Sequence, residues 1–332
     1  MQPPLCVVHR ETGVTTGDLR PEDAGRMVAL LNNVAVVRYL SQRIASPYTH
    51  ADADAFVARV VAGTWPSETQ PGRFWALRNA DDRFCGAMSV EPGSGEFREN
   101  GKVGYYLAPE LHGRGIMGSM VRGLADWALA QGTLRRLEAG VHAPNRASAR
   151  VLLAAGFHLE STARAAVLGR DGNRCDHHLF VRDVAPPEEN LGRLASGHGD
   201  LCLRRGFVTP RVYQTLREQA GWGTLPDAAR LETLGPSVAA AAVYVDDTPT
   251  ACARMIGDGL YFYLQDVLVA PAFQRRGLGT RLVHTLLADS APMRPPGSTV
   301  ALLAASGAEA FWSRMGFVRR GSDRPGMVLR TD

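Results

Sequence analysis

The stretch "FQRRGLGT", residues 273–280, places two arginines and two glycines between an apolar segment that ends at Val269 and an amphipathic segment that begins near Leu282. A related stretch, "LHGRGIMG", occupies residues 111–118. Apolar residues recur at helical spacing directly after both stretches, so each turn is predicted to join a strand to the start of a helix. Backbone N–H groups and the positive end of the helix dipole converge there, which predicts two anion-binding turns.

Two well-known phosphate loops do not match these turns. A Walker A loop ends in Gly-Lys-Ser/Thr, and neither copy has a lysine there. A dinucleotide-binding turn requires GxGxxG with an acidic residue about 20 positions later, and neither copy has that spacing. The remaining pattern is (Q/R)xxGx(G/A), which the second copy satisfies from Gln274 to Gly279.

The two turns belong to a long internal repeat. "APELHGRGIMG" at 108–118 and "APAFQRRGLGT" at 270–280 align without a gap, and each is followed by a Gly-Phe pair, at Gly156 and at Gly316. A repeat of this length is a duplicated domain, which agrees with a chain of 332 residues. We therefore predict a first domain over 1–184, a linker rich in Pro, Gly and polar residues over 185–200, and a second domain over 201–332.

The fold class follows from the alternation of patterns within each half. Strand-like runs such as "FWALRN", "VGYYLA", "AAAAVYVD" and "YFYLQDVLVA" alternate with helix-like stretches. This predicts an α/β or mixed α+β fold in two copies.

Composition excludes several function classes. The net charge of +4 comes from 37 basic and 33 acidic residues, which argues against a dedicated nucleic-acid binder. The 5 cysteines are scattered, and "DHH" at 176–178 has no further ligands at matching spacing, so neither a disulfide framework nor a metal site is predicted. The N-terminus lacks the features of a signal peptide and no apolar run approaches about 20 residues, so we expect a cytoplasmic protein that does not enter a membrane.

Both halves resemble the GNAT family of N-acetyltransferases, whose glycine turn holds the pyrophosphate of acetyl-CoA. The first half resembles the RimJ and RimL branch through "LRPEDAGRMVALLNN", "VGYYLAPELHGRGIMG", "RRLEAGVHAPNRASARVLLAAGF" and "DGNRCDHHLFVRD", in the expected order. The second half resembles compact single-domain GNAT enzymes through "YFYLQDVLVAPAFQRRGLGTRLV" and "AEAFWSRMGF". The resemblance implies a bent, partly parallel sheet that splits beside the turn, with the pantetheine arm of acetyl-CoA in the split.

The resemblance also implies which residues hold the cofactor. The arm would lie along residues 105–108 and 267–270 and pair with backbone groups there. The expected cofactor contacts in the first half are Leu107, His112, Gly113, Arg114, Gly115, Gly118 and Asn145. Those in the second half are Val267, Val269, Gln274, Arg275, Arg276, Gly277, Gly279 and Thr280.

The catalytic residues are less well determined. The family often protonates the leaving thiolate with a tyrosine four residues before the Gly of Gly-Phe, but Leu152 and Trp312 occupy those positions and neither can do so. The RimJ and RimL branch instead has an Asn-x-x-Ser element, which makes Ser148 a candidate.

The candidates for the general base lie in both halves. They are Glu110, Glu138 and His142 in the first half, and Asp266 with Tyr263 in the second half. The alternative interpretation is that the carboxylates are solvated charges at strand ends and that Ser148 bonds only to backbone.

Two functions remain open on the sequence. The first is an acetyl-CoA-dependent N-acetyltransferase acting on a primary amine, either a protein N-terminus or a small molecule such as an antibiotic or a biosynthetic intermediate. The second assigns catalysis to one half and makes the other a non-catalytic acyl-CoA-binding or structural module. The sequence does not indicate the oligomeric state.

Overall fold

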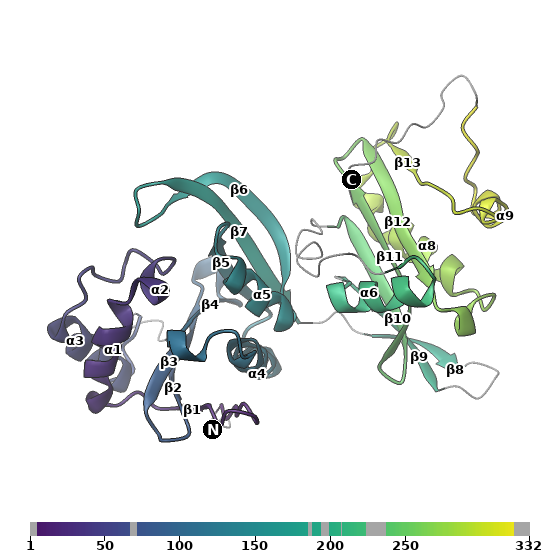
Figure 1. Cartoon of the computed structure of the whole chain (residues 1–332). Helices are drawn as coiled ribbons and strands as arrows, with labels where there is room; N and C mark the ends of the chain where they lie inside the picture. The colour runs from purple at the N-terminus through teal and green to yellow at the C-terminus, as the bar shows by residue number, and fades with distance from the viewer. Residues whose placement is uncertain are drawn as a thin grey trace. The chain divides into compact units, whose positions relative to one another are not determined.

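A computed structural model of the chain describes residues 5–66, 72–184, 188–193, 199–206, 208–223 and 237–321. Its described residues form two compact units, which we call unit 1 (within 5–184) and unit 2 (within 188–321). Figure 1 shows that each unit has its own sheet with helices packed on it. The predicted mixed α/β fold class is confirmed.

Unit 1 is built on a seven-stranded sheet of order β1-β2-β3-β4-β5-β7-β6. The strands are β1 (Thr15–Gly17), β2 (Arg73–Arg78), β3 (Phe84–Pro92), β4 (Asn100–Leu107), β5 (Arg136–His142), β6 (His158–Leu168) and β7 (Arg174–Asp183). The helices are η1 (Pro21–Asp23), α1 (Ala24–Leu31), α2 (Val34–Val37), α3 (His50–Val61), η2 (Gly95–Phe97), η3 (Pro109–Leu111), α4 (Ile116–Ala130) and α5 (Arg146–Ala154).

Unit 2 has a six-stranded sheet of order β13-β12-β11-β10-β9-β8 in its described residues. The strands are β8 (Glu189–Arg193), β9 (Asp200–Arg205), β10 (Ala239–Val245), β11 (Thr248–Gly257), β12 (Tyr261–Val269) and β13 (Thr299–Ala301). The helices are α6 (Pro210–Gln219), η4 (Pro271–Phe273), α8 (Leu278–Asp289), η5 (Ala291–Met293) and α9 (Glu309–Arg314).

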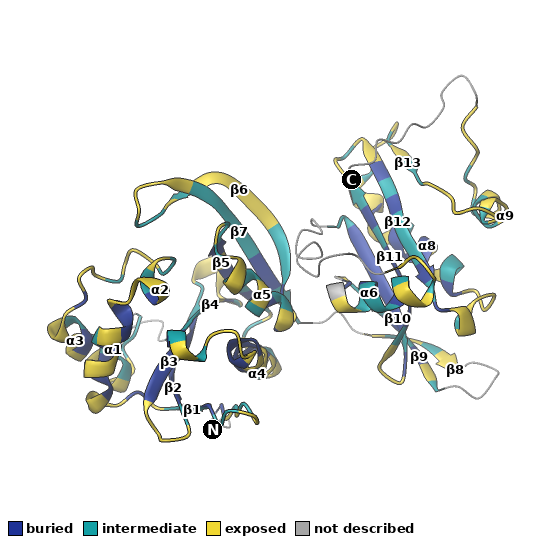
Figure 2. Cartoon of the chain, in the orientation of Figure 1, coloured by how far each residue is buried: buried dark blue, intermediate teal, exposed yellow. Residues whose placement is uncertain are grey.

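The same helix packs the core in both units. The apolar positions expected after the glycine turns lie on the buried faces of α4 and α8, where Met120, Leu124, Leu282 and Leu286 are fully buried. Figure 2 shows the buried residues concentrated along the central strands and the inner faces of these helices. The predicted amphipathic helices are therefore confirmed.

Two layers of helix cover the sheet of unit 1. Successive strand residues point to opposite faces, and Tyr105 contacts α5 while Tyr106 packs against a buried cluster from α1 and α3. The sheet thus lies between the α1–α3 layer and the α4–α5 layer, as Figure 1 shows.

Part of the predicted linker is a strand. Residues 189–193 form β8, which pairs antiparallel with β9 at the edge of the sheet of unit 2. Residues 189–193 show no apolar alternation, which fits an edge strand whose register is irregular between Asn190 and Gly192. The domain bounds, with a linker over 185–200, stay a prediction.

A buried ion pair ties η1 to the sheet of unit 1. Arg78 on β2 donates to both carboxylate oxygens of Asp23, at 3.2 and 2.8 Å, and both side chains are only 4% exposed. Arg78 also donates to the backbone carbonyls of Asp18 and Asp82. The pair therefore fixes the start of α1 on the sheet.

We expect Asp23→Ala to destabilise unit 1 by about 3 kcal/mol, because it removes the buried carboxylate partner of Arg78 and leaves the exposed Asp82 carboxylate, 3.7 Å from Arg78 Nε. Urea denaturation followed by tryptophan fluorescence measures the loss, since Trp75 and Trp127 of unit 1 are in ring contact. Asp126→Ala is the matched control: Asp126 pairs with Arg182 but is 58% exposed, so its loss should cost at most about 1 kcal/mol. Equal effects of the two substitutions would contradict the role of the buried pair.

Candidate functional site

The two glycine turns share the same backbone geometry. Gly115 and Gly277 have φ of +72° and +81° and immediately precede α4 and α8. Two residues earlier, Gly113 and Arg275 are also left-handed, with φ of +75° and +60°. A Cβ at Gly115 or Gly277 would meet no atom within 4 Å, so the positive φ is what requires glycine there.

Each turn is fastened to the strand before it by one side chain. His112 Nε2 lies 2.9 Å from the carbonyl oxygen of Leu107, and Gln274 Nε2 donates to the carbonyl of Val269 at 3.1 Å. These two pairs occupy equivalent positions in the repeat. The departure from the family pattern at His112 therefore preserves the contact that glutamine makes in unit 2.

The helices after the turns begin without a side-chain cap. Thr49, Asn145 and Thr209 cap α3, α5 and α6, whereas Gly115 and Gly277 offer no side chain to α4 and α8. Both turns are exposed to solvent, as are Arg114, Arg275 and Arg276. Uncapped first-turn N–H groups next to an exposed turn that carries arginine are suited to a phosphate anion.

Two further glycines, Gly118 and Gly279, lie in the first turns of α4 and α8 and affect how these helices pack. A Cβ at Gly118 would lie 3.3 Å from the Cβ of Ala154, and one at Gly279 would lie 3.5 Å from the ring of Phe311. Both therefore let the first turn pack closely on a neighbouring side chain. Thr280 follows in the first turn of α8.

Both sheets split beside the turn. In unit 1 the parallel pairing of β4 with β5 covers only Asn100–Lys102 and Arg136–Glu138, and in unit 2 that of β12 with β13 covers only 261–263 and 299–301. Ala108 N–H donates to Cys85 and Ala270 N–H to Thr250 on the other neighbouring strand. By alternation, the backbone groups of Tyr105, Leu107 and Val269 face the open side.

Side chains of unit 1 line this opening from several elements. Tyr105 Oη lies 2.7 Å from Ser148 Oγ and 3.2 Å from the carbonyl oxygen of Ser148 at the start of α5. Asn145 caps α5 by accepting from the Ser148 N–H at 3.2 Å. Leu152 is fully buried in the core. The sequence predicted Asn145 and Ser148 but missed the contact from Tyr105.

The two predicted carboxylates of unit 1 are both engaged in ion pairs. Glu110 pairs with Arg26 of α1 and is 59% exposed. Glu138 accepts from Arg136 at 2.8 Å and from the Asn100 side chain at 3.0 Å, where β4 and β5 still pair. Glu110 thus lies on the surface beside the turn, and Glu138 lies at the closed end of the split.

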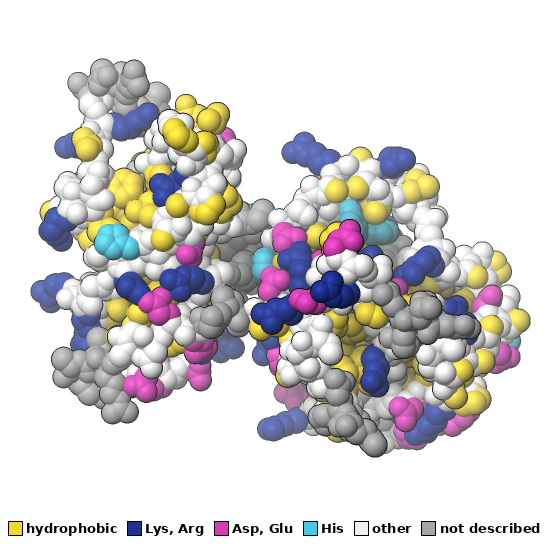
Figure 3. Space-filling view, turned by 180° about the vertical axis from the view of Figure 1, so that it is seen from behind, with side chains coloured by type: hydrophobic (Ala, Val, Ile, Leu, Met, Phe, Trp, Pro, Cys, Tyr) yellow, Lys and Arg dark blue, Asp and Glu magenta, His cyan; other side chains and the backbone are white. Residues whose placement is uncertain are grey.

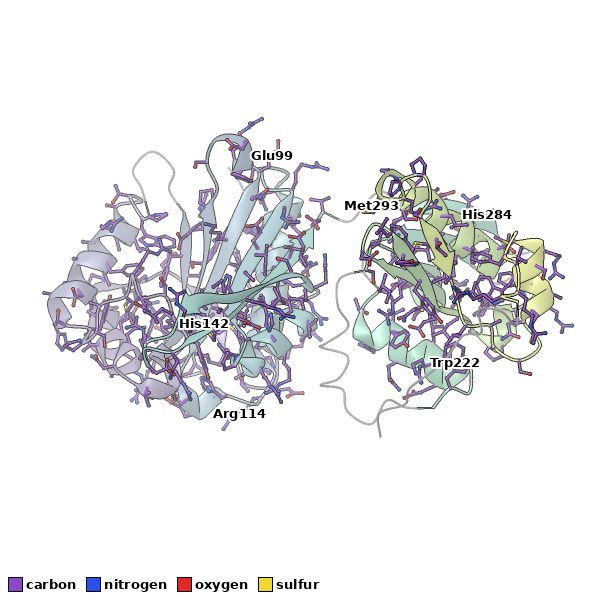
Figure 4. All side chains as sticks on the ribbon, turned by 90° about the horizontal axis from the view of Figure 1, so that it is seen from above. Glu99, Arg114, His142, Trp222, His284 and Met293 are labelled. Atoms are coloured by element: carbon purple, nitrogen blue, oxygen red, sulfur yellow. The ribbon has the colours of Figure 1, made fainter. Side chains whose placement is uncertain are left out.

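A histidine pair lies at the end of β5. His142 and His177 are directly opposite each other on β5 and β7, with ring centroids 6.4 Å apart, and Tyr39 contacts His142 edge to face at 6.0 Å. Figure 4 shows His142 beside the β6–β7 hairpin. Burial lowers the pKa of both imidazoles below 6.5, and the neighbouring histidines lower that of His177 further. Neutral imidazoles can accept a proton at pH 7.

The loop between α2 and α3 is tied to the tip of the β6–β7 hairpin. Gln42 donates to the carbonyl of Leu168 at 2.7 Å, and Arg170 donates to the carbonyls of Ser41 and Ile44, both at 2.7 Å. Arg43 also pairs with Glu91 on β3 at 3.1 Å. We call these joined segments, 41–44 and 168–170, the bridge. The bridge and the histidine pair are both built on the β6–β7 hairpin.

Unit 2 offers a different set of groups in its split. Asp266 lies in a bulge of β12 just before Val267, with φ of +55°, and accepts from Arg254 at 3.0 Å. Arg254 and Asp266 are 14% and 16% exposed, and the Arg254 guanidinium lies 5.8 Å from the Tyr213 ring. The predicted base Asp266 is therefore a member of an ion pair beneath α6.

Trp312, at the position of the family tyrosine in unit 2, contacts Phe311 and Phe317 with its ring and packs against the core of unit 2. In the described residues no group of three or more His, Cys, Asp or Glu could hold a metal ion. His178 and Asp176 instead contact Thr162 and the Ala165 N–H.

The surface charges bear on nucleic-acid binding, and the lengths and hydrophobicity of the helices bear on membrane insertion. On the face shown in Figure 3 the described basic and acidic side chains are interspersed. A search of the described helices finds none that is both long and apolar enough to cross a membrane.

Comparison with family models decides the assignment of both units. The acetyltransferase (GNAT) domain matches twice, over residues 17–158 and over residues 238–319, and together these ranges cover well over half of the chain. The chain belongs to the GNAT acetyltransferase family. The tandem arrangement inferred from the repeat is therefore confirmed.

Individual relatives agree with this assignment over shorter spans. A probable N-acetyltransferase of Bacillus subtilis, YjcK, is 40% identical over 94 residues, which is 28% of this chain and 52% of that protein. The match thus spans about half the length of this curated relative.

Solved structures of GNAT proteins resemble about half of the chain. A RimL ribosomal-protein acetyltransferase in complex with coenzyme A is 17% identical with a TM-score of 0.46, and covers 54% of this chain and 98% of its own. Mycobacterium smegmatis RimJ is 18% identical with a TM-score of 0.47, and covers 54% and 86%. The family assignment does not depend on these structural likenesses.

We expect Gly115→Ala and Gly277→Ala each to weaken coenzyme A binding to its own unit, because a Cβ at this φ costs about 1–2 kcal/mol and displaces the first N–H groups of the helix. Isothermal titration calorimetry measures the loss. Gly132→Ala is the matched control, because Gly132 has φ of +76° and equally open space but lies just after the end of α4. If Gly132→Ala weakened binding as much, the turn would not be the site.

We expect the free energy of unfolding of unit 1 to fall as the pH drops below 6.5. Burial lowers the folded-state pKa of His142 and His177, so the unfolded chain binds more protons in this window and stability is complete only above 6.5. Urea midpoints measured from about pH 7 to about pH 5 should show this slope, and His177→Gln should reduce it. His284→Gln, on the exposed face of α8 in unit 2, should leave the slope of unit 1 unchanged.

Proposed function

We propose that the protein transfers an acetyl group from acetyl-CoA to a primary amine. The observation that carries the proposal is the exposed, uncapped glycine turn placed directly beside a split in the sheet, in both units of a GNAT protein. The helix N-terminus and the arginines would bind the pyrophosphate. The open backbone edge of β4 and of β12 would pair with the amides of the pantetheine arm.

Each predicted cofactor residue has a place in this arrangement. The backbone of Gly113, Gly115, Gly277 and Arg275 would form the turn, and Arg114 and Arg276 would lie at the phosphates. His112 and Gln274 would hold the turn to the strand, while the edges at Leu107, Val267 and Val269 would meet the arm. Gly118, Gly279 and Thr280 would supply the first helical turn, and Asn145 would hold Ser148 in position.

We further propose that unit 1 performs the transfer. Its split contains Ser148 and Tyr105 next to a histidine pair, whereas the repeat places Ala308 and Val267 at the positions of Ser148 and Tyr105 in unit 2. Unit 2 would then bind acyl-CoA or support unit 1. Asp266 would be a structural partner of Arg254, because its carboxylate accepts a hydrogen bond from the Arg254 guanidinium and is only 16% exposed.

The acceptor that fits unit 1 best is an α-amine or another amine of low pKa. The basic groups near the split are neutral imidazoles and ion-paired carboxylates, which are poor at removing a proton from a lysine of pKa about 10.4. An α-amine, with a pKa of about 7.7–8.0, is already partly neutral at pH 7. Both a protein N-terminus and a small-molecule amine of similarly low pKa meet this requirement.

An acceptor screen tests the proposed function. The full-length protein is incubated with acetyl-CoA and with panels of N-terminal peptides and small amines, and mass spectrometry scores the gain of one acetyl group. We expect gain on α-amines and not on the lysine side chains of matched peptides with a blocked N-terminus. No gain with any amine would overturn the enzyme proposal.

Calorimetry with acetyl-CoA separates the two units. We expect two binding events per chain if both turns hold the cofactor, Gly277→Ala to remove one of them, and turnover to persist in that variant. Turnover that survives Gly115→Ala but not Gly277→Ala would place catalysis in unit 2 instead.

A further inference from the structure

A tyrosine reaches Ser148 from a different element than the one that carries it in the family pattern. Tyr105 lies on β4, beyond the last residue that pairs with β5, and its hydroxyl contacts the first turn of α5. The position on α5 where the family often has a tyrosine is Leu152, which is fully buried and apolar. Unit 1 thus places a phenol hydroxyl beside the open edge of β4 from the strand rather than from the helix.

The environment of Tyr105 keeps its hydroxyl protonated. Burial raises the pKa of Tyr105 well above its usual value, although the hydrogen bond with Ser148 offsets a part of this rise. The phenol therefore keeps its proton at neutral pH and can donate a hydrogen bond. The phenol hydrogen can go to Ser148 Oγ at 2.7 Å or to the Ser148 carbonyl oxygen at 3.2 Å. When it goes to the closer Oγ, the hydrogen of the Ser148 hydroxyl is left to point elsewhere.

We propose that Tyr105 is a positioning residue that donates to Ser148 Oγ and thereby directs the Ser148 hydroxyl hydrogen toward the sulfur of the thioester. This inference rests on the proposed acetyl transfer in unit 1. The backbone of Tyr105 faces the open side of β4, so the strand that meets the pantetheine arm also carries the side chain that orients the serine.

The step balances without a further reactant. The amine nitrogen forms a bond to the thioester carbonyl carbon, and the bond from that carbon to sulfur breaks. The Ser148 hydroxyl proton moves to the sulfur, and a proton lost by the amine nitrogen moves to Ser148 Oγ. Tyr105 keeps its own proton throughout, which agrees with its raised pKa.

The neighbouring residue Tyr106 supplies a matched control. Its ring points to the opposite face of the sheet and packs near Tyr48, and its hydroxyl is buried with no hydrogen-bond partner among the described residues. Tyr105→Phe and Tyr106→Phe therefore remove the same atom from adjacent positions of one strand. The hydroxyl removed by Tyr105→Phe contacts Ser148, whereas the hydroxyl removed by Tyr106→Phe does not.

The test measures kcat and KM of the full-length protein with an amine found in the acceptor screen. We expect Tyr105→Phe to lower kcat about tenfold, the value of one buried hydrogen bond, and to leave the KM for acetyl-CoA unchanged. Ser148→Ala should lower kcat about 100-fold, and Ser148→Thr should restore most of it because the hydroxyl returns. Tyr106→Phe should leave both constants unchanged.

The double variant decides between positioning and a general structural effect. In the Ser148→Ala background, Tyr105→Phe should cause no further loss of kcat, because no serine hydroxyl remains to be directed. Independent losses that multiply, or equal activities of Tyr105→Phe and Tyr106→Phe, would overturn the proposal.

Urea midpoints and coenzyme A affinity establish that each variant is folded. If Tyr105→Phe does not fold, the comparison of Ser148→Thr with Ser148→Ala takes its place as the test. In that case equal kcat of the two Ser148 variants would overturn the proposal. A wild-type protein that acetylates no amine would overturn the proposed function instead.

Discussion

The site depends on one constraint, which is that two adjacent parallel strands pair for only three residues and then diverge. Backbone N–H and C=O groups that lose their partner at a sheet edge must find another. In unit 1 the released edge runs from beyond Lys102 to Leu107, where the next turn begins. The strand that presents unpaired groups is thus continuous with the turn that presents unpaired helical N–H groups.

Short segments of the chain connect the glycine turn with the split in the sheet and with the residues around that split. β4 leads through η3 and the turn into α4, and β5 leads through Asn145 into α5. The close contact of Gly118 with Ala154 packs α4 on α5, so the two helices that follow the diverging strands support each other. A Cβ at Gly118 would lie 3.3 Å from the Cβ of Ala154, so even alanine there would need a small shift between α4 and α5.

Much of this arrangement could be predicted from local sequence patterns. Glycine at the left-handed positions, apolar residues at helical spacing and the duplicated landmarks all depend on neighbours in the chain, and the turns and the amphipathic helices followed from them. The strand β8 was missed because polar side chains, such as Glu189 in an ion pair with Arg205, replace the apolar alternation on this edge strand. Long-range contacts could not be predicted from local sequence patterns either. No pattern near Tyr105 indicates that its hydroxyl meets Ser148, and none near Glu138 or Asp266 shows that an arginine already holds the carboxylate.

The bridge has a consequence for the order in which unit 1 is assembled. Gln42 and Leu168 are 126 residues apart in the chain, so their hydrogen bond closes a very long loop. Such contacts form after local turns and hairpins, because the entropy of closing the loop is lost before the contact contributes. The turn before α4 is made by residues 111–118, whereas the bridge needs the β6–β7 hairpin near the end of unit 1. During synthesis the residues of the turn are therefore added to the chain well before the bridge can close.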